Sequence, residues 1–162
     1  MRRTSILAAV MTMFACDPVQ SSAVDALGGE VANVKRGPLH RAGQPCTTCH
    51  DGALGDPPAF SVAGTIYVDE AAQTAASGAT VTLTGANGAT HAATTNEVGN
   101  FYVTPSEYTP AYPMKVSVTY DQTTVEMVTR VGRNGSCADC HTSTAGSTSA
   151  GPVFIPTDGG TP

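Results

Sequence analysis

The chain has 162 residues, which is enough for one modest domain. Only 13% of the residues are charged and 6% are aromatic, while Gly and Pro number 17 and 11, a composition that disfavours a helical bundle and favours short strands joined by turns. The formal net charge of −5, without a basic patch, excludes a nucleic-acid-binding surface of the usual kind.

The first residues have the layout of a secretory signal. Two arginines are followed by an apolar run, residues 6–15, that is too short to span a bilayer. The run ends at Cys16, and a small residue before a Cys at this point resembles the cleavage junction of a bacterial lipoprotein. We therefore expect residues 1–15 to be removed and the protein to be exported to the periplasm or cell surface, anchored to the membrane by a lipid on Cys16. The alternative is ordinary cleavage that leaves a soluble periplasmic protein.

Residues 16–36 are predicted to form a tether, and the cysteine pattern begins after it. Cys16 is one of five cysteines, and the other four belong to two copies of one motif. The copies are Cys46-Thr47-Thr48-Cys49-His50, called here the first motif, and Cys137-Ala138-Asp139-Cys140-His141, the second motif. We assign them to haem-binding segments over residues 37–57 and 132–145.

The pattern C-x-x-C-H is the attachment signal of c-type haem, so the chain resembles a dihaem c-type cytochrome. Two thiols at this spacing bond covalently to the two vinyl groups of the porphyrin, and the following His binds the iron. We expect two haems, attached covalently through Cys46, Cys49, Cys137 and Cys140, with His50 and His141 as proximal iron ligands.

Three other uses of such cysteines are less suitable. A thioredoxin-like redox pair normally occurs once, in a βαβ setting that this chain lacks. The two pairs lie too far apart in the sequence for a zinc ribbon, and structural disulfides do not require a His after each pair.

Two further histidines, His40 and His91, are the candidate distal iron ligands, one for each haem. His40 lies in a Gly- and Pro-containing loop before the first motif, and His91 lies in a Thr-rich hairpin. Methionine is the alternative ligand and would raise the reduction potential. Met114 and Met127 are the residues considered for that role, although both are also explained as strand residues.

Between the motifs, residues 58–131 are predicted to form an antiparallel, Ig- or transthyretin-like β-sandwich. Alternating apolar residues and turn signals give about six strands, near residues 60–68, 79–84, 90–95, 100–103, 114–120 and 123–129. The Gly and Asn-Phe signatures at Val62-x-Gly64, Gly78-Ala-Thr-Val and Gly99-Asn100-Phe101 resemble the carboxypeptidase regulatory-like family. That resemblance implies a transthyretin-like fold with a structural or binding role and no particular reaction.

An up-and-down count of these strands places both motifs, His91 and Met114 at one end of the sandwich. The acidic turns at Asp69, Glu97 and Asp121 then lie at the other end. Cations near the motifs are candidate partners of the haem propionates: Lys35, Arg36, Arg41, Arg130 and Arg133.

The Ser-, Gly- and Pro-rich tail, residues 146–162, contains an apolar patch at residues 153–155 that could add an edge strand or cover a haem. The sequence favours an electron carrier working with redox partner proteins, not an enzyme, because two histidines per haem leave the iron without an open position. A binding or structural module stapled by haem, alone or in a larger multihaem assembly, is the first alternative. A small haem enzyme of the peroxidase or nitrite-reducing kind is the second.

Overall fold

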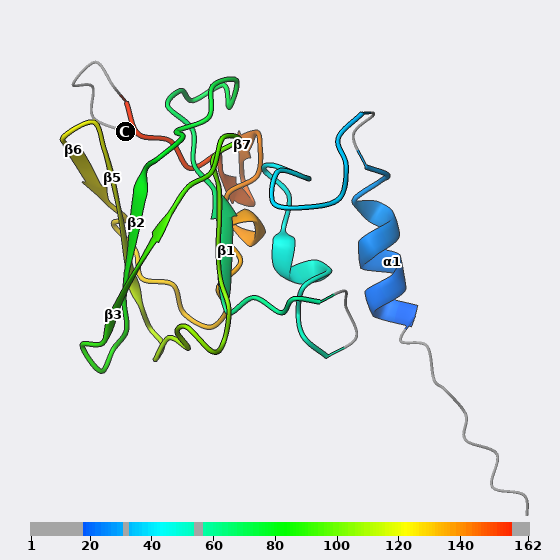
Figure 1. Cartoon of the computed structure of the whole chain (residues 1–162), viewed down its shortest axis with the longest axis horizontal. Helices are drawn as coiled ribbons and strands as arrows, with labels where there is room; N and C mark the ends of the chain where they lie inside the picture. The colour runs from blue at the N-terminus through cyan, green and yellow to red at the C-terminus, as the bar shows by residue number, and fades with distance from the viewer. Residues whose placement is uncertain (1–17, 31–32, 54–56, 157–162) are drawn as a thin grey trace, which may run out of the picture.

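A computed structural model of the chain describes residues 18–30, 33–53 and 57–156. The chain is mainly β, with antiparallel sheets in an arrangement consistent with a β-sandwich (Figure 1). Within those ranges no helix combines the length and the apolar character needed to cross a bilayer. Cys16 and the signal-like segment before it lie outside the described residues.

All six strands expected from the sequence are present, each within a few residues of its predicted bounds. They are β1 Val62–Thr65, β2 Thr80–Thr84, β3 Thr90–Thr94, β4 Asn100–Val103, β5 Lys115–Tyr120 and β6 Thr123–Glu126. Two more strands of two residues each, β7 Ala145–Gly146 and β8 Ser149–Ala150, form a small hairpin in the predicted tail.

Two sheets enclose the core. One has the order β3-β2-β5-β6 and the other pairs β1 with β4. Alternate residues of β2 and β5 point inward, so that Val81, Leu83, Val116 and Val118 pack against residues of the second sheet such as Phe101. Ile155, from the apolar patch in the tail, is fully buried in this core, and its neighbours extend the β1 side through a bridge between Tyr67 and Phe154.

The strand β1 differs from its expected alternating pattern, because all four of its residues are buried. Its register with β4 puts Val62 opposite Val103 on the core face. The other face and the free edge are covered by chain from the two motifs. Gly43 donates its N–H to the Thr65 hydroxyl at 2.8 Å, and Ala63 forms a parallel bridge with Ser136.

The described part of the chain contains three short helical segments. These are the helix α1, Pro18–Ala26, and the 3-10 turns η1, Cys46–Thr48, and η2, Cys137–Asp139. The helix occupies the segment expected to be a tether. It begins with Pro, which is tolerated at a first helical position, and ends before Gly28, whose φ of +73° is characteristic of a helix C-terminus. Gln20 of α1 donates a hydrogen bond to the Thr48 carbonyl of η1.

The strand directions follow the up-and-down count, but the motifs lie beside β1 and not beyond its end (Figure 1). The chain leading to η2 runs parallel to β1 at Ala63, which carries the second motif along the side of the sheet. Met114 is 1% exposed and belongs to the core, so core packing is enough to explain why an apolar residue occupies this position.

Candidate functional site

The two motifs have the same local conformation. In each, the first Cys begins a 3-10 turn and accepts two backbone hydrogen bonds, from the second Cys and from the His that follows it. The distances are 3.2 and 3.0 Å in the first motif and 3.2 and 2.9 Å in the second. A turn this tight brings two thiols and an imidazole, far apart in an extended chain, onto one short loop.

The two motif histidines are held in the same way. The Nδ1 atom of His50 lies 2.9 Å from the Pro58 carbonyl oxygen, and that of His141 lies 2.9 Å from the Gly151 carbonyl oxygen. A carbonyl oxygen can only accept, so these contacts select the tautomer with the proton on Nδ1. The lone pair is then on Nε2, which is the arrangement typical of histidines that bind a metal.

The first motif opens into a cavity of about 490 Å³. Both of its cysteines and His50 line this cavity, together with His40 from the preceding loop. Val24 of α1, Leu27 directly after this helix, and the rings of Phe60 and Tyr102 provide apolar walls. The volume falls in the usual range for pockets that bind a small molecule or cofactor, roughly 300–1,000 Å³.

Within this cavity His40 and His50 face each other closely. Their ring centroids are 6.0 Å apart and the ring planes are inclined by 58°. An imidazole nitrogen binds a metal at about 2.0–2.1 Å. Because the ring centre lies roughly 1 Å beyond that nitrogen, two imidazoles on opposite sides of one ion have centres about 6 Å apart. The separation of the His40 and His50 ring centroids therefore equals the spacing of such a pair.

A buried polar network fixes the loop that carries His40. Asn100 of β4, which is 4% exposed, donates through Nδ2 to the carbonyl oxygens of His40 at 3.0 Å and Pro38 at 3.3 Å. Its Oδ1 accepts from the Thr65 hydroxyl at 2.7 Å, and Asn96 also donates to Pro38. This network anchors the loop to the β1–β4 sheet, which explains why a segment without regular structure has a defined position.

Charged groups gather on one side of the cavity. Glu30 lies 3.1 Å from the Nε of Arg41, 3.8 Å from the Nε of Arg36 and 3.5 Å from the Nδ1 of His40. Desolvation opposes ionisation of Glu30, but the hydrogen bond from Arg41 and the charges of Arg41, His40 and Arg36 hold its pKa below the usual range. Arg41 also donates to Gln44 and to the Gly28 carbonyl, so most of its donors are already used by protein groups.

Of the five cations suggested as propionate partners, two line this cavity, Arg36 and Arg41. Arg36 has a side chain that is 74% exposed and sits at the rim. Lys35, Arg130 and Arg133 are exposed and are not among the residues lining either cavity.

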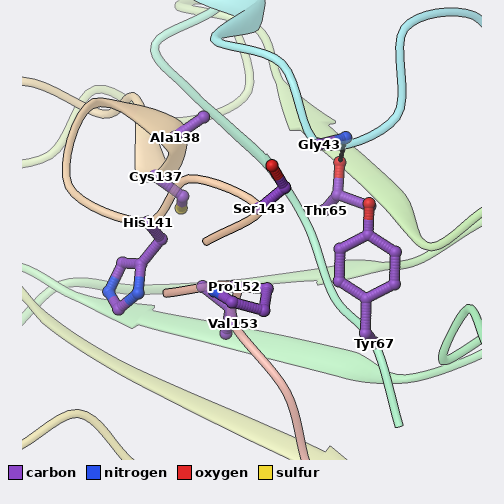
Figure 2. Close-up of a pocket in the computed structure, with 9 residues that line it drawn as sticks. All are labelled: Gly43, Thr65, Tyr67, Cys137, Ala138, His141, Ser143, Pro152 and Val153. Atoms are coloured by element: carbon purple, nitrogen blue, oxygen red, sulfur yellow. Dashed lines mark hydrogen bonds between the residues drawn. The ribbon is translucent and has the colours of Figure 1, made fainter. Parts of the chain in front are cut away.

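Among the described residues, the cavity beside the second motif is much smaller than the first cavity. The space beside Cys137 and His141 is only about 10 Å³, which is room for about one water molecule (Figure 2). Cys137 lies against Gly64, where an added Cβ would come within 2.7 Å of the Cys137 Cβ and 2.8 Å of its Sγ. Burial and the nearby Cys46, Asp139 and Cys140 raise the pKa of the Cys137 thiol to about 12. Cys140 in contrast is exposed.

The cysteines of the first motif lie in a more open setting than Cys137. Burial also raises the pKa of Cys46, with a smaller contribution from neighbouring Cys49, but both residues face the cavity. The two motifs are also neighbours, since η1 and η2 both pack against β1. Residues far apart in the sequence are thus brought together across β1.

The remaining candidate ligands lie away from both cavities. His91 is half-buried on β3, opposite Leu83, so it points to the core side of the sheet, where it stacks on Tyr108 with ring centroids 5.5 Å apart. Met114 lies in the core, and Met127 packs against it. None of the three lines either cavity, and the role of His91 as a distal iron ligand stays a prediction.

Comparison with known proteins finds nothing similar. No family model matches the chain, and neither the curated proteins nor the solved structures contain a match. The interpretation of the site therefore rests on the residues and geometry of this chain.

Four features of the site were not anticipated from the sequence: α1 as a cavity wall, Glu30 beside His40, Asn100 under the loop, and Gly64 beneath Cys137. In the sequence, Asn100 and Gly64 stand out only as parts of a fold signature. Glu30 carried no signal, because a single acidic residue in a polar stretch is common. Its role depends on a turn of chain that brings it back to His40.

Proposed function

We propose that this protein is an exported dihaem c-type cytochrome that transfers electrons, with each haem bonded to the two cysteines of one motif. The observation that carries the proposal is the first cavity, in which Cys46, Cys49 and His50 meet His40 across a space of cofactor size. The bound haem would supply one-electron redox chemistry. His50 and His40 would be its two axial ligands.

The repeated motif geometry supports a second haem. The second motif has the same 3-10 turn and the same Nδ1-to-carbonyl contact as the first, so its histidine is held for the same task. Its small cavity implies that the second haem lies at the surface, or that the Thr- and Ser-rich chain after His141 moves to receive it. His91 is proposed as the other ligand of this haem.

The β-sandwich then acts as the scaffold that fixes the separation of the two haems, in the manner of a transthyretin-like module of the carboxypeptidase regulatory-like type. The packing of η1 and η2 against the same strand, β1, supports direct electron exchange between the haems. Redox partner proteins would deliver and remove the electrons. A lipid on Cys16 would keep the protein at a membrane facing the periplasm or the cell exterior.

Electron transfer is favoured over catalysis because His40 and His50 line the same cavity, and both would hold the iron of one haem. A haem enzyme needs an open position for peroxide or nitrite. The second candidate function is a structural or binding module within a larger multihaem assembly, which the core-like packing of the second motif favours.

The test is to produce the chain in a host with c-haem assembly and to measure the mass of the denatured protein. Two covalent haems are expected in the parent chain. One is expected in the double variant Cys46→Ala/Cys49→Ala and one in Cys137→Ala/Cys140→Ala, which serve as matched controls. Visible spectra should show low-spin haem. Zinc without covalent haem would contradict the proposal, and a high-spin iron that binds peroxide or nitrite would favour the enzyme.

A further inference from the structure

We propose that Glu30 is a positioning residue that accepts a hydrogen bond from the Nδ1 of His40 and so directs the Nε2 of His40 toward the first haem. The inference rests on the proposed function. It assigns a role in the haem site to a residue outside both motifs.

Two buried polar atoms beside the first cavity have no hydrogen-bond partner. They are the Nδ1 of His40 and the Oε2 of Glu30. They belong to residues already in contact, since the Oε1 of Glu30 is 3.5 Å from that same Nδ1. Buried polar atoms are nearly always paired in native proteins. A small rotation of the carboxylate satisfies both atoms at once, and this completes the site when His40 binds iron.

The Glu30 carboxylate is held in place by Arg41. The Nε of Arg41 donates to Glu30 at 3.1 Å, and the same guanidinium donates to Gln44 at 2.8 Å and to the Gly28 carbonyl at 2.9 Å. Arg41 has a left-handed backbone, with a φ of 51°, which is uncommon for a residue other than Gly, Asn or Asp. The turn thus sends the Arg41 side chain back to Glu30, beside the adjacent His40.

The two facing histidines differ in the group that their Nδ1 atoms contact. His50 contacts a neutral carbonyl oxygen through Nδ1, whereas His40 contacts a carboxylate. A carboxylate behind a histidine fixes its tautomer and makes the ligand more basic, which stabilises the more highly charged, oxidised metal. Glu30 is therefore expected to lower the reduction potential of the first haem and leave that of the second unchanged.

The decisive variant is Glu30→Gln in the full haem-loaded chain. Gln has the same shape and retains an acceptor oxygen, but it lacks the charge. Loss of such a partner changes metal affinity by about 10–100-fold. A tenfold change confined to one oxidation state corresponds to about 59 mV for a one-electron couple. We expect the midpoint potential of one haem to rise by at least this amount and its ferric electron paramagnetic resonance signal to shift.

Two internal references accompany the measurement. The second haem should keep its potential, and Asp121→Asn, which removes an exposed carboxylate from the turn between β5 and β6, should leave both haems unchanged. Thermal unfolding separates positioning from folding. A structural role alone would lower the unfolding temperature of Glu30→Gln without moving the potential or the resonance signal.

Unchanged potential and resonance signals of the first haem in both Glu30→Gln and Glu30→Ala would overturn the inference, while the dihaem proposal would stand. Absence of covalent haem in the parent chain would instead overturn the dihaem proposal itself. If Glu30→Ala does not fold, the isosteric Gln variant still decides the question.

Discussion

The imidazole rings of His40 and His50 lie 6.0 Å apart across the first cavity, although two unrelated parts of the chain hold them. His50 is fixed by the motif turn and the Pro58 carbonyl, and His40 by a loop that rests on Asn100. This convergence is the geometry on which the proposed ligation of the first haem depends. Each anchor can be removed separately.

Replacing His40 by Ala is expected to convert one of the two haems from low-spin to high-spin, because the iron loses one axial ligand. Both haems should remain covalently attached, since no cysteine is changed. Visible and electron paramagnetic resonance spectra of the oxidised protein measure the spin state, and the mass of the denatured chain measures attachment.

The matched control is His91→Ala, which removes the other histidine outside the motifs. His91 stacks on Tyr108 and lies outside the first cavity, so its loss should leave the first haem unaltered. A change confined to the second haem would support His91 as the ligand of that haem. Loss of the same signal in both variants would contradict the placement of His40 in the first cavity.

Asn100 is expected to matter for the same haem without touching it. Asn100→Ala removes the donor to the His40 carbonyl, one of the two donors to the Pro38 carbonyl and the acceptor of the Thr65 hydroxyl proton. The cost is about 1–3 kcal/mol for each group that stays buried and unsatisfied. We expect lower stability in denaturant and heterogeneous ligation of the first haem, seen as a mixture of low-spin and high-spin signals.

A second substitution at the same position separates the two halves of this network. Asn100→Asp keeps the shape and the acceptor for Thr65, but it removes the two N–H donors to the His40 and Pro38 carbonyls. It should therefore disturb the loop as strongly as Ala does. A fully stable Asp variant with unchanged spectra would mean that the loop does not depend on Asn100.

The sequence predicted the strands well because their signals are local. Alternation of apolar residues in β2 and β5 reports one buried face, and Asn-Gly and acidic turns mark the ends. The prediction erred at β1, whose alternation was expected from Val62 onward. Its outer face is covered by the loop around Gly43 and its free edge by Ser136, contacts that come from distant parts of the chain.

The candidate site likewise combines features that the sequence shows with features that only the fold reveals. The motifs can be recognised in the sequence because their residue types and spacing fall within five consecutive positions. The difference between the motifs was not, because the cavity beside His50 needs α1, while Cys137 is closed off by Gly64. Neither contact leaves a periodic trace in the sequence. The helix itself was missed because nine residues with low amphipathicity resemble a polar linker.

Titration of Cys137 gives a prediction about the haem-free chain. Its thiol has a pKa of about 12 in the folded state, mainly because it is buried, against an ordinary value of 9.0 that applies when the chain unfolds. Between these values the unfolded chain has released a proton that the folded chain retains. Stability is therefore full below about pH 9 and falls as the pH rises toward about 12, by about 1.4 kcal/mol per pH unit.

The measurement is the free energy of unfolding of haem-free protein in urea at several pH values from about 8 to 11. Cys137→Ala should flatten the decline, and Cys140→Ala, which removes an exposed thiol from the same motif, should not. Tyrosines titrate in the same range, and burial together with the Cys137 charge raises the pKa of Tyr112, so Tyr112→Phe is added to the parent and to both variants. Equal slopes for the two variants would show that the Cys137 thiol is accessible to water.

Gly64 tests whether the second motif rests on β1. A Cβ at this position would lie 2.7 Å from the Cys137 Cβ and 3.1 Å from the Phe101 ring, so Gly64→Ala forces one of them to move. Overpacking of this kind costs about 1–3 kcal/mol. Since Phe101 is fixed in the core and Cys137 lies on a short turn, we expect Cys137 to be displaced. In the haem-free chain its thiol should then react faster with an alkylating reagent, as followed by mass spectrometry of the digested protein.

Gly132→Ala is the control, because the space around that residue is open. It should leave both the stability, within about 0.5 kcal/mol, and the alkylation rate unchanged. A Gly64→Ala variant as stable as the parent, with Cys137 still unreactive, would contradict the packing of the second motif against the sheet.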